Sequence, residues 1–264
     1  MENIYFELTE AFNKDEPTVA LASGQAVVFY RIAIMSKDGD WVIRESPDAC
    51  ERVLLELERR GARYRIGAPL DVRWLAGGWS SHFEFFDASR RRVRCDFVSR
   101  PPRASPASIE LLFSSARSRL LAVDPESLIL MKQTQRAKDY AVIGELAALL
   151  PQTREIELST DPDRILTLAP VVGTSSTRPA VRAALSGAGR RAVVSALAEE
   201  TDELQQRDAA RLALYEEAAK PYIAACRAAP FGDLPLREAH ARLCEIAERW
   251  LPRTISESAN DADA

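Results

Sequence analysis

The sequence lacks the marks of several large protein classes. No apolar run reaches the roughly 18–20 residues that a membrane span requires. The N-terminus carries Glu2 and Glu7 and has no basic region, so we do not expect a signal peptide. The net charge of −4 gives no global basic field of the kind that attracts nucleic acid. We therefore expect a cytoplasmic protein without a membrane partner.

Histidine and cysteine are also scarce. There are only two histidines, and the four cysteines match no CxxC pair or zinc ribbon. The cysteines are Cys50, Cys95, Cys226 and Cys244. We interpret them as reduced, mostly buried thiols, and His82 and His240 as structural. A Ser-His-Asp hydrolase is disfavoured because no nucleophile-elbow sequence occurs.

The first half of the chain alternates between strand and helix patterns, and its apolar share of 47% is ample for a core. Helices are expected at residues 3–12 and 25–32, and from Ser46-Pro47 to Gly61. Strands are expected at residues 19–22, 35–43, near 64–66 and at 71–75. A hairpin should follow, with arms at residues 82–86 and 93–98.

The second half is expected to be helical. Helices are predicted from Asp124-Pro125, at residues 137–150, and near 180–199, 203–229 and 235–250, with Pro221 kinking or dividing one of them. Residues 151–179 are interpreted as loop-rich, with 173–177 the most flexible part. The pattern predicts an α+β fold, a small mixed sheet flanked by helices and followed by a helical C-terminal portion. We place a core at residues 1–122, the helical portion at 123–253 and a disordered tail at 254–264.

The candidate site begins with the segment Ser36-Lys37-Asp38-Gly39-Asp40-Trp41. Two carboxylates at positions i and i+2 of an extended segment lie on one side of it, and they repel unless a cation lies between them. Mg²⁺ suits such oxygen ligands together with substrate phosphates. Upstream, the Ser23-Gly24 turn could bring backbone N–H groups to a phosphate. On the second hairpin arm, Asp96 points away from the apolar side of its strand.

The order of these features resembles the nucleotidyltransferase superfamily of the DNA polymerase β type. Within it the chain looks most like the minimal bacterial nucleotidyltransferases, including toxins of abortive-infection (type IV toxin–antitoxin) systems. That family has a Gly-Gly or Gly-Ser turn, a helix, Asp-x-Asp and a third Asp on a later strand. Here Ser23-Gly24, Asp38-Gly39-Asp40 and Asp96 hold these places, over about residues 1–150. Two positions depart from the pattern, since Ser23 replaces a glycine and Gly39 replaces a branched apolar residue.

The resemblance implies a reaction and a role for each of these residues. The protein would transfer an NMP from an NTP to a hydroxyl of RNA, a protein or a small molecule, with two Mg²⁺ ions, and could have a cognate toxin or antitoxin partner. In this scheme Asp38, Asp40 and Asp96 would be catalytic and hold the metal. The nucleotide would be bound by Ser23, Gly24, Lys132 and Lys138.

Other interpretations of the same residues remain open. Gly39 inside the Asp-x-Asp motif suits a catalytically inactive nucleotidyltransferase fold that serves as a binding or regulatory module. Lys132 could be a solvated helix lysine, and Lys138-Asp139 a local pair at a helix start. The basic run made by Arg90, Arg91, Arg92 and Arg94 could form a solvated hairpin tip or contact RNA phosphates.

Overall fold

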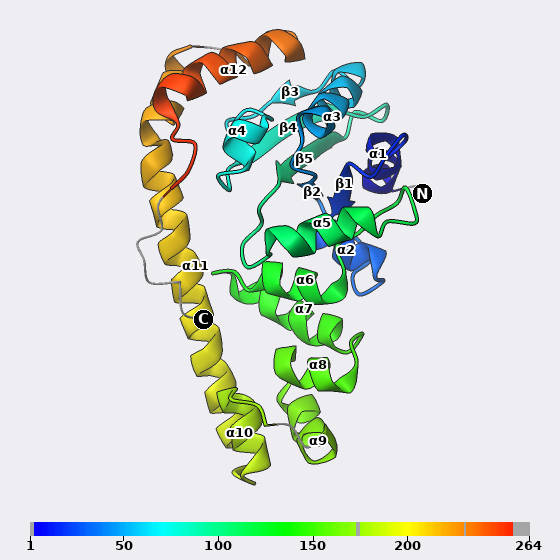
Figure 1. Cartoon of the computed structure of the whole chain (residues 1–264), viewed down its shortest axis with the longest axis vertical. Helices are drawn as coiled ribbons and strands as arrows, with labels where there is room; N and C mark the ends of the chain where they lie inside the picture. Colours follow the sequence, from blue (N-terminus) through cyan, green and yellow to red (C-terminus); the bar gives the residue numbers. More distant parts are fainter. Residues whose placement is uncertain (1–2, 173–174, 230, 256–264) are drawn as a thin grey trace. The chain divides into compact units, whose positions relative to one another are not determined.

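The structure is a computed structural model that describes residues 3–172, 175–229 and 231–255 (Figure 1). The chain divides into two compact units. The first contains residues 1–123 and 213–264, and the second contains residues 124–212. The first unit therefore combines the N-terminal segment, up to residue 123, with residues 213 onward. Most of the expected tail, at 256–264, and part of the expected flexible stretch, at 173–174, lie outside the described residues.

The first unit is an α+β structure around a five-stranded mixed sheet of order β1-β2-β5-β4-β3. Only the β2–β5 pair is parallel; β1–β2, β4–β5 and β3–β4 are antiparallel. The strands are β1 (Val19–Leu21), β2 (Gly39–Ile43), β3 (Arg63–Tyr64), β4 (Ser80–Phe86) and β5 (Arg92–Val98). The helices are α1 (Ile4–Phe12), α2 (Ser23–Phe29), α3 (Pro47–Arg59), α4 (Val72–Leu75), α5 (Pro106–Ser114) and α12 (Leu236–Trp250).

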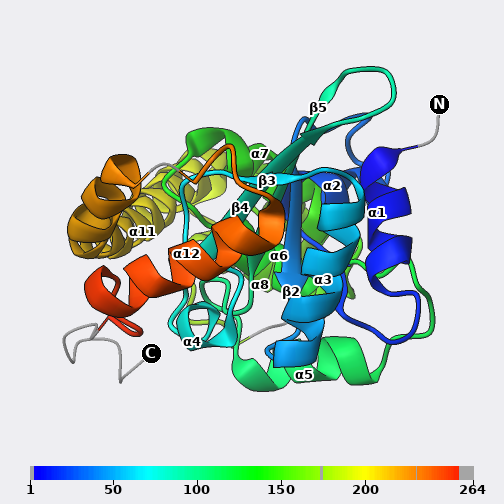
Figure 2. The same cartoon turned by 90° about the horizontal axis from the view of Figure 1, so that it is seen from above.

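One face of the sheet is apolar, and α1, α3 and α12 lie over it (Figure 2). Alternation along β5 buries every second side chain, as the sequence predicted for Val93, Cys95 and Phe97. A series of aromatic rings crosses this face from one covering helix to the other. It comprises Phe12, Trp41, Phe97, Phe83, Tyr64 and His240. The opposite face of the same strands is therefore free to carry polar side chains.

Local signals account for most element boundaries in this unit. Ser46 caps α3 by accepting a hydrogen bond from the amide of Ala49 at 3.1 Å, and Gly61 follows the helix at φ 67°. The expected strand at residues 71–75 is wrong. Asp71 accepts from the amide of Arg73 at 2.9 Å, which caps the short helix α4 instead. The expected strand near residues 64–66 shrinks to Arg63–Tyr64.

The second unit is helical. It contains α6 (Pro125–Lys132), α7 (Ala137–Ala147), α8 (Gln152–Leu158), α9 (Pro162–Val172), α10 (Pro179–Leu185) and the first part of α11 (Gly189–Ala228). The loop-rich interpretation of residues 151–179 is wrong, because α8 and α9 bury Ile156, Ile165 and Leu168 in this unit's core. The separate helices expected at 180–199 and 203–229 are also wrong: α11 is one helix, and Pro221 does not divide it.

No helix in the described part of the chain is long and apolar enough to cross a membrane. All four cysteines are free thiols; three are buried and Cys244 is half-buried. The expectation of mostly buried thiols is therefore confirmed.

Candidate functional site

The candidate site lies on the charged face of the sheet, where β2 and β5 run parallel. Asp40 of β2 is the register partner of Asp96 of β5, so the two carboxylates stand on neighbouring strands at the same height. Parallel neighbours are about 4.8 Å apart. Both residues are half-buried, and Asp96 points away from the apolar face as the sequence predicted. The topology thus brings together two of the three carboxylates, which are 56 residues apart in the chain.

The sequence predicts that Asp38 and Asp40 lie on one strand, but the structure places only Asp40 on β2. The strand begins at Gly39, and Asp38 forms part of the bend before it. One of its oxygens, Oδ1, lies 3.6 Å from Nη1 of Arg94, which is on the charged side of β5. Asp38 therefore reaches the same face as Asp40 and Asp96, but its carboxylate is beside a guanidinium group.

Asp96 also has two basic side chains as neighbours, which the sequence did not reveal. Its Oδ1 lies 2.8 Å from Nδ1 of His82 and 3.3 Å from Nη1 of Arg65. His82 is the register partner of Asp96 across β4 and β5, and its Nε2 is 3.0 Å from the hydroxyl of Ser80. Hairpin register could have indicated the contact with His82. The contact with Arg65 requires the position of β3, which no local pattern provides.

Gly39 is explained by packing on the apolar face. A Cβ atom at residue 39 would lie 2.5 Å from Cδ1 of Tyr5 and would overlap the indole ring of Trp41. The Trp41 side chain therefore occupies the space that a branched residue would need. Glycine is required at residue 39 because the Trp41 ring fills the space beside it. The glycine therefore does not by itself indicate a defective site.

The bend before β2 is held by buried polar groups. The amide of the Gln25 side chain donates to the carbonyl of Ser36 at 3.0 Å, and the Tyr5 hydroxyl donates to the carbonyl of Lys37 at 2.5 Å. Burial raises the pKa of Tyr5 to about 12, with smaller contributions from Cys95, Asp38 and Asp40. The backbone leading into Asp38 is thus anchored to α1 and α2.

The Ser23-Gly24 turn is built as a tight strand-to-helix connection. Ser23 has φ 47°, in the left-handed region, and α2 begins at this residue. A Cβ atom on Gly24 would lie 2.9 Å from Cβ of Ser36 and would overlap its hydroxyl. The glycine is therefore needed to let α2 approach the bend. Contact of Ser23 and Gly24 with a phosphate stays a prediction.

Lys132 and Lys138 lie in the second unit and differ from each other. Lys132 is buried, so it is not a solvated lysine, and its Nζ is 3.6 Å from Oδ1 of Asp139. Asp139 also accepts from Thr134 and Arg136, both at 2.8 Å. Lys138 is exposed. Their binding of a nucleotide stays a prediction, and the buried pair gives Lys132 a structural role within its own unit.

Two of the three carboxylates offer the kind of ligands that Mg²⁺ takes. Mg²⁺ usually takes one or two carboxylates, several waters and substrate phosphates, and Asp40 and Asp96 supply two oxygen donors on adjacent rigid strands. The carboxylates of Asp38, Asp40 and Asp96 do not come together at one point. Among the described residues, a different group of three side chains is the one whose potential ligand atoms all lie within 4.8 Å of one another. Asp40 and Asp96 are therefore of the ligand type that suits the ion, whereas Oδ1 of Asp38 lies 3.6 Å from Nη1 of Arg94.

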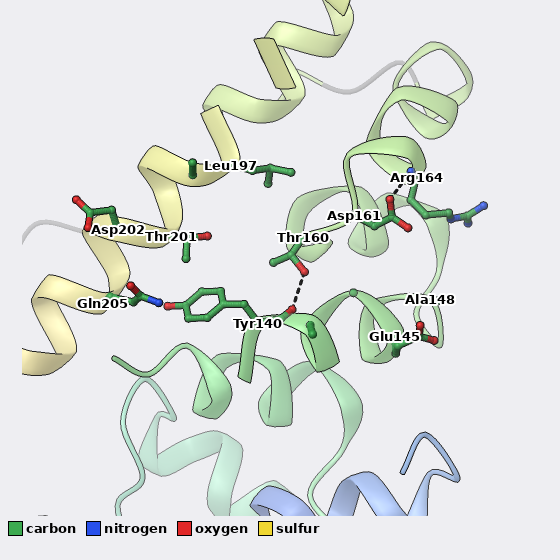
Figure 3. A pocket seen from close by; sticks show the side chains of 13 residues that line it. Tyr140, Glu145, Ala148, Thr160, Asp161, Arg164, Leu197, Thr201, Asp202 and Gln205 are labelled. Atoms are coloured by element: carbon green, nitrogen blue, oxygen red, sulfur yellow. Dashed lines mark hydrogen bonds between the residues drawn. The ribbon is translucent and has the colours of Figure 1, made fainter. Parts of the chain in front are cut away.

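Two hollows lie elsewhere. The larger, about 750 Å³, is in the second unit between α7, the start of α9 and α11 (Figure 3). Tyr140 and Gln205 point into it, and the Thr160 hydroxyl donates to the carbonyl of Tyr140 at 2.9 Å. A hollow of about 600 Å³ in the first unit contains Glu45 and Arg100, which pair with each other. None of the predicted site residues lines either hollow.

Comparison with known proteins gives little. Neither a protein-family model nor a curated protein sequence matches this chain. Two solved structures from Helicobacter pylori are similar to it, a "putative nucleotidyltransferase" and the protein JHP933. Each is 12% identical, with TM-scores of 0.39 and 0.40; they cover 78% and 79% of this chain and 93% and 92% of their own. Likeness of this degree does not decide an activity, so function depends on what these side chains can do.

Proposed function

We propose that the protein is a cytoplasmic nucleotidyltransferase of the DNA polymerase β type, which transfers an NMP from an NTP to a hydroxyl acceptor. The observation that carries the proposal is the pairing of Asp40 with Asp96 on parallel strands, with Asp38 two residues before Asp40. A strand, the Ser23-Gly24 turn and a helix precede them in the order that the family resemblance requires.

In this proposal Asp38, Asp40 and Asp96 would hold Mg²⁺. The bound ions would supply charge neutralisation for the triphosphate and for the attacking and leaving oxygens. Asp40 and Asp96 are positioned for this by the ladder between β2 and β5, which does not need to reorganise. Asp96 is also suited to accept the proton of the acceptor hydroxyl. Ser23, Gly24, Lys132 and Lys138 are proposed to contact the nucleotide.

The acceptor and the biological setting belong to the same proposal. RNA, a protein or a small molecule could provide the hydroxyl, and the family resemblance favours a toxin–antitoxin component with a cognate partner. The net charge of −4 argues against recognition of RNA by a global basic field. A protein or small-molecule acceptor is therefore the first to test.

The test is transfer of label from each NTP in the presence of Mg²⁺, with RNA, protein and small-molecule acceptors. We expect labelled product that disappears on metal chelation. Asp96→Asn should lower the rate by about two orders of magnitude, the loss typical when a group that stabilises transition-state charge is removed. Asp48→Asn, at an exposed carboxylate of α3, is the matched control. Absence of both transfer and Mg²⁺-dependent nucleotide binding would contradict the proposal.

A second function is favoured by one observation. The guanidinium groups of Arg65 beside Asp96, and of Arg94 beside Asp38, balance carboxylates that a metal would otherwise have to neutralise. This suits a binding or regulatory module without turnover. In that case Asp38→Ala would leave the cellular effect of the protein intact, whereas loss of the effect would support the enzyme.

A further inference from the structure

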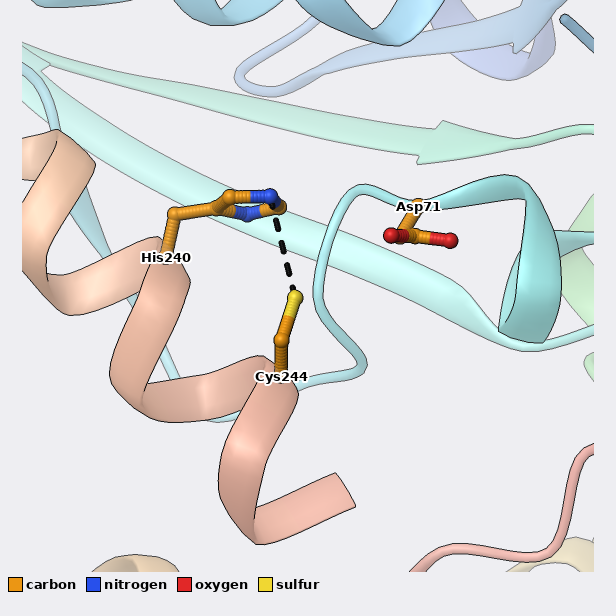
Figure 4. A group of neighbouring side chains, drawn as sticks. All are labelled: Asp71, His240 and Cys244. Atoms are coloured by element: carbon orange, nitrogen blue, oxygen red, sulfur yellow. Dashed lines mark hydrogen bonds between the residues drawn. The ribbon is translucent and has the colours of Figure 1, made fainter. Parts of the chain in front are cut away.

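A second cluster of metal-ligating side chains lies away from the carboxylates, where α12 meets the loop that leads into α4. It consists of His240, Cys244 and Asp71 (Figure 4). One potential ligand atom from each residue lies within 4.8 Å of the others. All three residues belong to the first unit and are half-buried. The nucleotidyltransferase proposal gives this cluster no task.

We propose that His240, Cys244 and Asp71 form a binding site for a zinc ion. Zn²⁺ is the divalent ion that commonly accepts a nitrogen, a sulfur and an oxygen ligand together, and Mg²⁺ avoids sulfur. With three protein ligands, a water molecule would complete a tetrahedral shell. The site would connect α12 to the loop before α4, which is about 170 residues earlier in the chain.

The helix supplies two ligands at the spacing that zinc requires. His240 and Cys244 are four residues apart, so they project from one side of α12 toward the Asp71 loop (Figure 4). Their Nε2 and Sγ atoms lie 3.7 Å apart. In a tetrahedral site with Zn–S of about 2.3 Å and Zn–N of about 2.0–2.1 Å, these atoms would be about 3.6 Å apart. The observed separation therefore needs almost no adjustment.

Tyr64 orients the imidazole ring for this task. Its hydroxyl lies 2.8 Å from Nδ1 of His240 and accepts a hydrogen bond from the amide of Leu70 at 3.1 Å. A hydroxyl oxygen has two lone pairs, so it can accept both the Leu70 N–H and an Nδ1–H. In this Nδ1–H tautomer, which an ion bound at Nε2 would select, the lone pair of Nε2 faces Cys244. Ligand histidines usually have such a partner on their other nitrogen.

The acidic groups around the proposed site, including Asp71, balance the charges of Zn²⁺ and of Arg73. Oδ1 of Asp71 accepts hydrogen bonds from the amide and Nε of Arg73, at 2.9 and 3.0 Å. Oδ2 accepts from Nη2 of Arg73 at 2.8 Å and keeps a second lone pair for the ion. Arg73 also pairs with Glu248 of α12. Binding of Zn²⁺ would replace the proton of the Cys244 thiol, which leaves to solvent. The carboxylate and thiolate then match the two charges of the ion, while Glu248 matches Arg73.

The test is titration of the metal-free full-length chain with Co²⁺, in a large excess of Mg²⁺ so that carboxylate sites are occupied. We expect one equivalent of Co²⁺ to give a thiolate-to-cobalt absorption band, and Zn²⁺ to remove it. The band should be lost in Cys244→Ser and kept in Cys226→Ser, a buried thiol of α11. Tyr64→Phe should weaken binding about 10- to 100-fold.

A second measurement uses the wild-type protein alone. Zn²⁺ should protect Cys244 from alkylation, with the modified peptides identified by mass spectrometry, so the test does not depend on the folding of any variant. The proposal is overturned if wild-type protein gives no stoichiometric thiolate band. It is also overturned if the band survives Cys244→Ser, or if Zn²⁺ leaves Cys244 as reactive as before.

Discussion

The two faces of the sheet in the first unit use the same strands but are held in different ways. On the apolar face, rings from β2 and β5 contact α1, a ring from β3 contacts α12, and a ring from β4 lies between them. On the charged face, Asp40, Asp96 and His82 stand side by side on β2, β5 and β4. The apolar face should therefore control stability, and the charged face should control chemistry. Substitutions at alternate residues of one strand can therefore separate effects on stability from effects on chemistry.

Trp41→Ala should have the largest effect on stability. Trp41 is 0% exposed, packs on Phe12 and Phe97, and donates from Nε1 to the Thr9 hydroxyl at 2.8 Å. Its loss leaves a cavity and removes this hydrogen bond, and we expect the free energy of unfolding to fall by about 3–5 kcal/mol. Chemical denaturation measures this. Trp250→Ala, at a tryptophan that is 52% exposed, should cost far less, and equal losses would contradict the comparison.

Gly39→Ala should have the next largest effect on stability, although it adds only one methyl group. The added carbon would overlap the rings of Tyr5 and Trp41, which both belong to packed elements. We expect a loss of about 1–3 kcal/mol, as for other overpacked cores. The control is Gly232→Ala, where a Cβ atom would meet nothing within 4 Å. A neutral or stabilising Gly39→Ala would show that the strand has room for a Cβ atom at this position.

Gly39 also shows where sequence reasoning stops. Apolar and polar residues alternate along β5 in the sequence. This alternation correctly predicts that Asp96 lies on the other face of the sheet from Cys95 and Phe97. The need for glycine at residue 39 depends on the direction of the Trp41 ring and on Tyr5, which belongs to a separate helix. The local sequence pattern reveals neither of these. The positions of Arg65 and His82 beside Asp96 likewise depend on strand order.

Short or polar helices were the other weak point. The single turn of α4 is too short to show a helical period, and its start depends on the cap at Asp71. The helix α8 buries Ile156 and Glu155 but otherwise presents polar residues, so its sequence looked like a loop. Helix α11 continues through Pro221, where sequence alone favoured an interruption. The i, i+4 spacing of His240 and Cys244 was visible, but Asp71 becomes their neighbour only through the fold.

Tyr5→Phe tests the boundary between the two faces and should have a smaller, pH-dependent effect. At neutral pH it removes the hydrogen bond to Lys37, worth about 0.5–1.5 kcal/mol. Burial raises the pKa of Tyr5 to about 12, above the value near 10 of an unfolded chain. Its contribution is therefore complete below pH 10 and is lost as pH rises toward 12.

The measurement for Tyr5 is the difference in unfolding free energy between wild type and Tyr5→Phe from pH 8 to about 12. Other buried tyrosines are the same in both proteins, so their titration cancels in the difference. We expect the difference to shrink across this range. A difference that stays constant would mean that Tyr5 ionises as readily in the folded protein as in the unfolded chain.

Asp40→Asn should have the smallest effect on stability and the clearest effect on function. The carboxylate of Asp96 stands on the neighbouring strand, so removing one negative charge relieves repulsion, and we expect a change within about 0.5 kcal/mol. Mg²⁺ should raise the unfolding temperature of wild type but not of Asp40→Asn, because only an intact ligand set couples binding to folding. Asp48→Asn should respond to Mg²⁺ like wild type. If Asp40→Asn instead destabilises the fold by several kcal/mol, both faces are structural, and the carboxylates belong to the packing of the sheet.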